Sequence, residues 1–370
     1  MKILHIVTLI DQKGSYGGPA TVARNFMKEI NSLGGSCRIL AGSLDEENRQ
    51  VSVAMENIVM AKVYRFFPIS SFAPLYSFKF FRISAKEISN VEVVHIHFSR
   101  DIIAILSGLL SLILRKKLIL QTHGMIVRDH RILVRVFDFV ITKPILKRSD
   151  LVLALSTEEK QKLEYFTSKT IEIVSNGVHN NAEKPSFKGD KRESIVTFIG
   201  RIAKVKNPMI FAEVCREFRE KGFETKFLMY GPDGGELNNV LDYIAREGLD
   251  LNFKYMGSLE PHGVIEKLSQ SNLNILPSTF ENVPMVALES MSVGTPTLIM
   301  ENNMLASDIG LLDKRLVCSV YDPKVIAEAA VEVLKISDQI EYREKLKNLV
   351  VSKYSLNKIT KDYLARLDSL

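Results

Sequence analysis

Cysteine and long apolar runs are both scarce in this chain of 370 residues. The three cysteines lie far apart, are odd in number and form no CxxC pair, so we expect no disulfide framework and a reducing, cytoplasmic setting. The longest uncharged apolar stretch, residues 102–114, has 13 residues, whereas a helix that spans a bilayer needs about 20. The N-terminus, MKILHIVTL, has no signal-peptide cleavage pattern. We therefore expect neither a transmembrane helix nor a secretory leader.

Several motifs with a defined chemistry are also absent. The chain has no Walker A loop and no GxGxxG fingerprint, which disfavours a dinucleotide oxidoreductase. His95 and His97 stand two residues apart at a strand end and share a face, but no DxD and no Cys/His cluster completes a metal site. We expect no metal ion and no cofactor. Nucleic-acid binding is disfavoured because no nucleic-acid motif accompanies the basic charge.

The length and the apolar pattern indicate two doubly wound α/β domains. A chain of this length is too long for one ordinary core. Apolar strands alternate with helices in both halves, which is typical of parallel sheets. The expected strands are 3–9, 38–41, 91–96, 118–122, 151–155, 171–174, 195–199, 226–230, 252–256, 272–276 and 297–300. The expected helices are 20–33, 101–114, 208–221, 235–247, 261–269, 284–292, 323–337, 338–353 and a tail from 356.

A polar stretch divides the two series. Residues 178–193 contain Pro185 and Gly189, lack an apolar period and indicate a linker. We expect Rossmann-like domains over 1–177 and 194–353, followed by a helical segment over 354–370. A ligand would bind between the domains, at the carboxyl ends of their strands.

Positive charge is concentrated in the first half. Residues 1–177 carry 24 Lys/Arg and 16 Asp/Glu, a net of +8, whereas residues 178–370 carry 25 and 27, a net of −2. Two segments, 64–82 and 128–148, interleave cations with apolar or aromatic side chains. Such a face suits an anionic membrane surface. A packed apolar side with a solvated basic side explains the pattern equally well.

The most informative motif places two glutamates around a helix start. Glu281 and Glu289 have seven residues between them, and Asn282 and Pro284 suit a cap and a first turn. Free amides at a helix start attract phosphate, and an ionised carboxylate accepts hydrogen bonds from hydroxyl groups. The motif therefore fits sugar, diphosphate and ribose in that order, although a capped helix with two solvated glutamates would look similar.

Cations and glycines follow other expected strands. Arg201 and Lys206 can bind a diphosphate leaving group without a metal. His123 ends a strand, where it can donate a hydrogen bond to a sugar or phosphate. Gly231 and Gly257 end two more strands and can shape a pocket for base and ribose. The loop 14–20, which includes Gly17 and Gly18, can approach a phosphate closely or form a tight turn.

Together these residues resemble the family 4 retaining glycosyltransferases of the GT-B fold. The match follows the family's order over residues 1 to about 300, and the Glu-x7-Glu element with its upstream Arg/Lys pair is its specific part. The resemblance implies two Rossmann-like domains facing a central cleft, with the C-terminal helix crossing back to the first. The matching segments are Gly17-Gly18, Thr122-His123-Gly124, Asn176-Gly177-Val178, Gly200-Arg201, Lys206, Tyr230-Gly231, Met256-Gly257 and 281–289.

The resemblance also implies a role for each site residue. Arg201 and Lys206 would stabilise the leaving diphosphate. Glu281 and His123 would contact the donor sugar, and Glu289 the ribose. The amides of Met285 and Val286 and the glycines Gly17 and Gly18 would lie near the phosphates. Two departures concern the family's glycine after the loop lysine, here Asn207, and its Gly-Gly-x-x-Glu, replaced by Glu301-Asn302-Asn303.

We therefore expect a metal-independent hexosyltransferase that uses a UDP- or GDP-sugar. Its acceptor would be a glycan, linked to a polyprenyl diphosphate, in the biosynthesis of a cell-surface polysaccharide such as lipopolysaccharide O-antigen or capsule. The protein would be cytoplasmic and peripheral on the inner face of the plasma membrane. A nucleotide-sugar epimerase and a non-catalytic nucleotide-sugar-binding protein are the alternatives on the same architecture.

Overall fold

The computed structural model describes residues 1–10, 17–44, 57–65, 75–179 and 194–370, which form two compact units. Unit 1 contains the described residues up to Asn176 together with Leu356–Leu370, and unit 2 contains those of Gly177–Ser355. No helix in the described part of the chain has the length and apolar character that a bilayer crossing requires. Most of the expected linker, residues 180–193, lies outside the described residues, and Val178 pairs with Ser355 within unit 2.

Unit 1 is built on a parallel seven-stranded sheet in the order β3-β2-β1-β6-β7-β8-β9. The strands are β1 (Lys2–Val7), β2 (Ser36–Ser43), β3 (Ile58–Lys62), β6 (Val93–His97), β7 (Lys117–Gln121), β8 (Leu151–Ala154) and β9 (Ile171–Ile173). The order reverses between β1 and β6, which makes this pair the switch point of the sheet. A short antiparallel pair, β4 (Tyr64–Arg65) and β5 (Leu75–Tyr76), lies outside the sheet.

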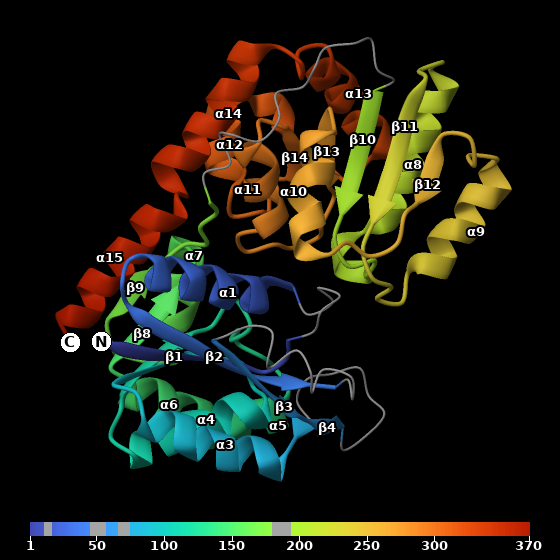
Figure 1. The fold of residues 1–370 in the computed structure, drawn as a ribbon. Helices are drawn as coiled ribbons and strands as arrows, with labels where there is room; N and C mark the ends of the chain where they lie inside the picture. Colours follow the sequence, from blue (N-terminus) through green and yellow to red (C-terminus); the bar gives the residue numbers. More distant parts are fainter. Residues whose placement is uncertain (11–16, 45–56, 66–74, 180–193) are drawn as a thin grey trace. The chain divides into compact units, whose positions relative to one another are not determined.

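Side chains alternate along these strands between two packed faces. Leu4 and Ile6 of β1 join the large apolar cluster on one face, whereas His5 points to the other. Helices α3 (Phe78–Ser89), α4 (Ile102–Ile113) and α6 (Lys143–Arg148) lie on the apolar face, and α1 (Gly17–Ser32) lies on the opposite one (Figure 1). The described residues of unit 1 also form α5 (Ile132–Phe137), the π-helix η2 (Asp138–Thr142) and α7 (Thr157–Leu163).

The C-terminal helix α15 (Leu356–Asp368) packs in unit 1 against α1. Its Tyr363 is fully buried beside Phe26, and its Asn357 donates a hydrogen bond of 2.7 Å to Glu29. The chain therefore returns to its first unit, as the resemblance implies.

Unit 2 repeats the architecture on a parallel six-stranded sheet in the order β12-β11-β10-β13-β14-β15. The strands are β10 (Ser194–Ile199), β11 (Thr225–Tyr230), β12 (Phe253–Tyr255), β13 (Leu273–Leu276), β14 (Thr297–Met300) and β15 (Val317–Cys318). The helices are η3 (Lys204–Lys206), α8 (Pro208–Glu220), α9 (Leu237–Glu247), α10 (Pro261–Ser269), α11 (Met285–Ser292), α12 (Ala306–Leu312), η4 (Lys314–Leu316), α13 (Pro323–Leu334) and α14 (Ile340–Lys353). The switch point lies between β10 and β13.

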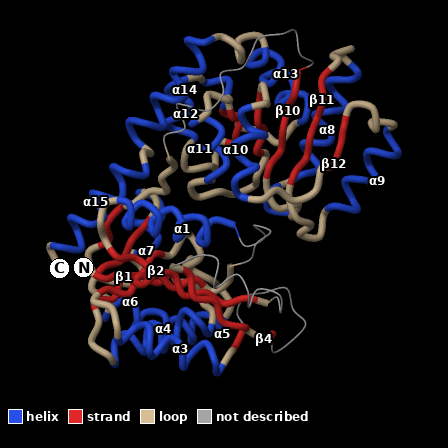
Figure 2. The backbone as a smooth tube through the Cα atoms, viewed as in Figure 1, coloured by secondary structure: helices blue, strands red, loops and turns tan. Residues whose placement is uncertain are grey.

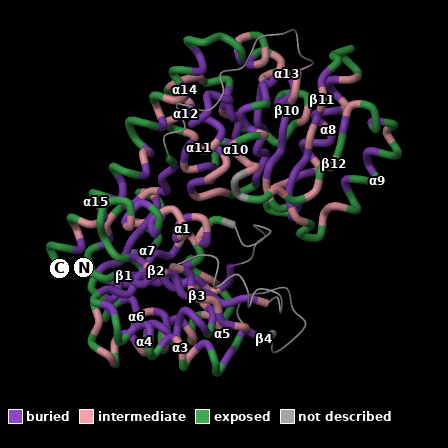
Figure 3. Tube along the Cα trace, viewed as in Figure 1, coloured by how far each residue is buried: buried purple, intermediate pink, exposed green. Residues whose placement is uncertain are grey.

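The two α/β units confirm the predicted fold class. Figure 2 shows strands and helices alternating in both units, and Figure 3 shows that the strands of both sheets are largely buried. All three cysteines are free and buried. The sequence prediction missed the strands β3, β4, β5 and β15 and the helices α3, α5, α6, α7 and α12, all of which except α3 have seven residues or fewer.

Candidate functional site

The switch point of unit 2 brings Lys206 and Glu281 together. Lys206 follows β10 and Glu281 follows β13, and the order of strands places both loops at neighbouring carboxyl ends. Their side chains form an ion pair and are only 23% and 14% exposed. Ser278 adds a hydrogen bond of 2.9 Å to the Glu281 carboxylate. Two residues predicted as separate site elements are therefore one contact.

A backbone clamp holds these two loops against each other. The amide of Thr279 donates to the carbonyl of Val205 at 2.9 Å, and its hydroxyl donates to the same oxygen at 3.2 Å. Asn207, which stands where the family often has glycine, adopts a left-handed φ of +51°. Asparagine tolerates this conformation better than most residues with a side chain, so the departure from the family pattern leaves the turn intact.

The predicted glycines lie at the ends of neighbouring strands and bond to one another. Gly231 donates its amide to the carbonyl of Gly257 at 2.9 Å, and the amide of Gly200 donates to Tyr230 at 3.0 Å. Gly231 has φ +141°, and a Cβ there would lie 1.8 Å from the carbonyl oxygen of Gly200. This close approach requires glycine. Arg201 directly follows Gly200 in the sequence and is exposed. Its guanidinium is therefore accessible at the same edge of the sheet.

Helix α11 begins beside this pair, and no side chain of the described residues caps it. The N-cap residue is Pro284, so the expectation that Asn282 caps the helix is wrong. Proline makes the N-cap because its extended backbone leads into the first turn at Met285. The amides of Met285 and Val286 therefore lie at an uncapped helix start, where the partial positive charge attracts an anion.

Glu289 lies in the second turn of α11, partly buried. Burial raises the pKa of its carboxyl to about 7. Within the described residues its carboxylate has no hydrogen-bond partner. A half-buried acid without a partner suits a ligand hydroxyl.

The segment after β14 supplies a contact that the sequence reasoning missed. Glu281 pairs with Asn303 in a backbone bridge, and Asn302 donates hydrogen bonds to the carbonyl of Thr279 and to the Tyr321 hydroxyl. Asn302 therefore supports the Glu281 loop in the place where the family has Gly-Gly-x-x-Glu. The Asn302-Asn303 pair was seen in the sequence, but its partners are too distant along the chain to infer.

In unit 1 the structure places His123 directly after β7 in a left-handed conformation, with φ +50°. Gly17 and Gly18 form the first turn of α1, and Gly18 has open space around its Cα. Residues 14–16 of the predicted phosphate loop lie outside the described residues. His123 is partly exposed, as a ligand-binding side chain requires.

A buried cluster of histidines adjoins His123. His97 Nδ1 lies 2.7 Å from His123 Nε2, and His97 Nε2 lies 3.1 Å from His5 Nδ1. His95 bonds Tyr363 instead, at 2.8 Å. Nitrogen atoms of His5, His95 and His97 lie within 4.8 Å of one another, a spacing that could hold a metal ion. The expectation of no metal stays a prediction.

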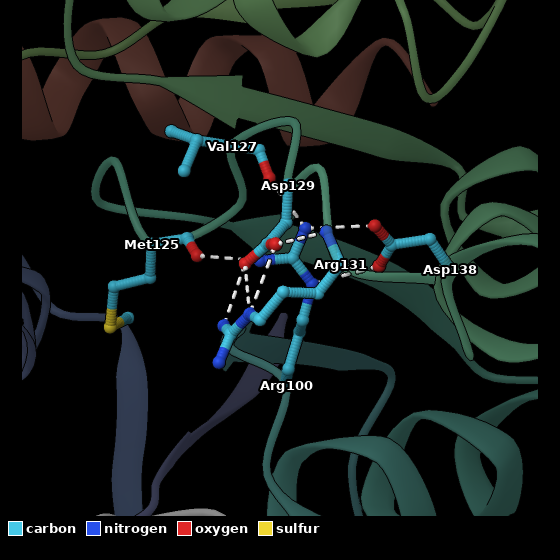
Figure 4. A network of polar contacts seen from close by, with 6 residues as sticks. All are labelled: Arg100, Met125, Val127, Asp129, Arg131 and Asp138. Carbon is cyan, nitrogen blue, oxygen red and sulfur yellow. Dashed lines mark hydrogen bonds and ion pairs between the residues drawn. The ribbon is translucent and has the colours of Figure 1, made fainter. Parts of the chain in front are cut away.

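The basic segment 128–148 forms α5, η2 and α6. Arg100, which precedes the segment in the sequence, holds it in place. Figure 4 shows Arg100 bound to Asp138 through two hydrogen bonds of 2.8 and 2.9 Å and to the carbonyls of Met125 and Val127. Beside it lies a cavity of about 440 Å³. Its lining includes the cations Arg128, Arg135 and Lys143.

One part of the apolar side of this segment packs in the core, where Ile145 and Leu146 of α6 are buried, and another part is exposed. Leu133 is 85% exposed and Phe139 is 76% exposed, next to exposed Ile132, Val136 and Val140. The interpretation of a packed apolar side therefore holds for α6, and it does not account for the exposed apolar side chains of α5 and η2. The described part of the other segment, 64–82, is also mixed, because Phe80 is fully buried while Phe78 is exposed.

Two family models match the chain in succession. "Glycosyltransferase Family 4" matches residues 16–181 and "Glycosyl transferases group 1" matches residues 180–349. The Escherichia coli UDP-Gal:alpha-D-GlcNAc-diphosphoundecaprenol alpha-1,3-galactosyltransferase is 28% identical over 41% of this chain and 43% of its own length. The 2-deoxystreptamine N-acetyl-D-glucosaminyltransferase of Niallia circulans is 26% identical over 75% of this chain and 76% of its own. The first relatives are matched over about two fifths to one half of their length.

Solved structures share the fold over the whole chain. Anabaena HepE in complex with UDP has a TM-score of 0.75 at 14% identity, with all of both chains covered. Staphylococcus aureus TarM in complex with UDP and a glycan has a TM-score of 0.75 at 12% identity, with 99% of each chain covered. The fold is therefore that of GT-B proteins.

Proposed function

Because the chain belongs to the family 4 glycosyltransferases, whose models match residues 16–349 between them, we propose that it transfers a sugar from a nucleotide diphosphate to a glycan. The observation that carries the proposal is the Lys206–Glu281 pair at the switch point, next to the uncapped start of α11. A cation, a carboxylate and free amides meet there, and these are the groups that a sugar diphosphate needs.

The proposed reaction breaks the bond between the anomeric carbon and the diphosphate oxygen. The diphosphate leaves with the electron pair, and the acceptor hydroxyl oxygen bonds the anomeric carbon on the same face. The acceptor proton passes to the leaving phosphate. Lys206 and Arg201 stabilise the charge that develops on the diphosphate, so neither a metal nor a protein base is needed.

Donor recognition divides between the other residues. The amides of Met285 and Val286 donate hydrogen bonds to phosphate oxygens. Glu289 accepts hydrogen bonds from the ribose hydroxyls. Gly231 and Gly257 have no side chains, so the two strand ends leave room for a base to lie against them. Glu281 and His123 contact the sugar.

We expect the acceptor to be a lipid-linked glycan in the synthesis of a surface polysaccharide. Support comes from the E. coli relative, whose name gives a diphosphoundecaprenol-linked acceptor, and from the exposed apolar and basic surface of α5 and η2. Exposed Leu133 and Phe139 would enter the interface of a cytoplasmic membrane while Arg135 and Lys143 bind anionic headgroups. Equal partition to neutral and anionic vesicles would contradict the membrane part.

Calorimetry with UDP, GDP and ADP in EDTA tests the donor site. We expect one nucleotide to bind tightly without metal and to lose binding in Glu289→Ala. No binding to any of the three would contradict the proposal. Incubation with the matching nucleotide sugar alone then tests the epimerase alternative, because an epimerase changes the donor when no acceptor is present.

A further inference from the structure

The backbone around His123 is fixed by one buried carboxylate. Glu159 accepts hydrogen bonds of 2.5 Å from the Thr122 hydroxyl and 2.5 Å from the Gly124 amide, the residues on either side of His123. It also accepts one of 2.7 Å from the amide of Leu155. A non-glycine residue with positive φ costs energy and persists only where its surroundings hold it. Glu159 provides that hold.

The side chain of His123 is fixed by a second device, a row of hydrogen-bonded imidazoles. His123 Nε2 pairs with His97 Nδ1, and His97 Nε2 pairs with His5 Nδ1. His5 in β1 and His97 in β6 face the same side of the sheet and are fully buried. At its inner end the row stops, because His5 Nε2 is buried and has no hydrogen-bond partner among the residues that the structure describes.

All three rings are neutral at pH 7, so each carries one proton. Burial lowers the pKa of His5 to about 3, that of His123 to about 4, and that of His97 well below its usual range. A neutral imidazole donates through one nitrogen and accepts through the other. The row therefore has two consistent states, with every proton on Nδ1 or every proton on Nε2.

The inner end distinguishes these states. With all protons on Nε2, His5 would bury an N–H without an acceptor, and an unpaired buried donor is costly. With all protons on Nδ1, His5 leaves only a bare acceptor in the core, the less costly defect. The outer nitrogen of His123 then carries a proton.

We propose that His97 and His5 are positioning residues that hold His123 in the Nδ1-protonated form, so that it presents an N–H donor to a hydroxyl or phosphate oxygen of the substrate. The contact with substrate rests on the proposed function, whereas the protonation pattern is a property of the chain alone. Glu159 fixes the backbone position of His123, and the histidine row fixes which ring nitrogen of His123 carries the proton.

The test is a long-range ¹H–¹⁵N spectrum of the full chain labelled with [¹⁵N]histidine, at pH 7. The signals of His123 are identified by their loss in His123→Gln. We expect the proton of His123 on Nδ1, and we expect His97→Phe to replace this fixed pattern by that of a mixed tautomer. His95→Phe is the matched control, since His95 is equally buried but bonds Tyr363, and it should leave the His123 signals unchanged.

Three results would overturn the proposal. They are a proton on Nε2 of His123 in the unaltered chain, unchanged His123 signals in His97→Phe, and one zinc ion per chain by mass spectrometry, because ligation takes the bare nitrogens that the row uses. If His97→Phe does not fold, the spectrum of the unaltered chain still decides. Failure to bind any nucleotide would contradict the donor site and leave this result standing.

Discussion

Lys206 and Glu281 neutralise each other across the switch point, and this pairing sets the lysine apart from its neighbours. Lys204, two residues earlier on η3, is exposed and has no described partner. A cation held beside the leaving group stabilises charge only as the bond breaks, so its loss lowers turnover more than binding.

We expect Lys206→Ala to reduce turnover by roughly 10²-fold or more. Initial rates of nucleotide release with donor and acceptor measure this effect, and Lys204→Ala serves as the control. Rates within a few-fold of each other in the two variants would remove Lys206 from the site.

We expect Glu289 to make nucleotide binding depend on pH. Burial raises the pKa of its carboxyl to about 7, so at pH 6 most chains carry the protonated acid. Ribose hydroxyls donate to the ionised form, and binding must therefore release a proton below pH 7. Affinity should rise between pH 6 and pH 8, by a factor approaching 10 for each pH unit below the pKa.

Calorimetry of UDP at pH 6, 7 and 8 checks this sign. The diphosphate itself also ionises near pH 6, so Glu289→Gln provides the baseline. We expect a shallower dependence in Glu289→Gln. Equal slopes in the two proteins would show that Glu289 does not titrate with binding.

At the scale of elements, three strand ends in unit 2 depend on one close backbone approach. A methyl group at Gly231 would collide with the Gly200 carbonyl and would also require a positive φ. We expect Gly231→Ala to lower the free energy of unfolding by about 3 kcal/mol or more. Gly200→Ala should change it little, because the nearest atom to its Cβ lies 4.0 Å away. Urea unfolding curves of both variants decide, and similar midpoints would contradict the argument.

How far the sequence predicts these elements depends on the range of the interactions that form them. The strands of both sheets follow from local apolar runs, and most observed strands begin and end within a few residues of the expected positions. Helix α11 was also expected, but its cap was not, since Pro284 takes that position by its backbone alone. Local pattern thus predicts an element better than its ends.

The histidine row shows what local pattern cannot supply. His95 and His97 share a face by simple alternation, and the sequence reasoning noted this. Their meeting with His5 requires that β1 pair with β6, across 85 intervening residues between the strands. Glu159 was likewise invisible as a clamp, because its bond to Gly124 depends on the neighbouring positions of β7 and β8.

At the scale of the whole molecule, part of the excess positive charge of residues 1–177 lies on one surface of unit 1. The net charge of +8 in residues 1–177 includes the cations around the cavity beside α5, where Lys143 lies 3.9 Å from the ring centre of Tyr165 and Arg128 lies 5.0 Å from it. The salt bridges between Arg100 and Asp138 keep this surface attached to the loop that follows His123. We expect a membrane contact there to hold unit 1 near the proposed lipid-linked acceptor.

Two exposed leucines allow a matched test of this membrane contact. Leu133 on α5 and Leu311 on α12 are each 85% exposed, but only Leu133 lies among the apolar and basic side chains of the proposed surface. Burying a leucine in the membrane interface contributes about 1.5–3 kcal/mol, so Leu133→Asp should weaken binding to phosphatidylglycerol-containing vesicles by roughly 10-fold or more. Leu311→Asp should bind like the unaltered chain. Added salt should weaken binding of the unaltered chain, because it screens the headgroup attraction. Vesicle sedimentation measures all three, and an equal loss in both variants would show that added negative charge, rather than this surface, determines binding.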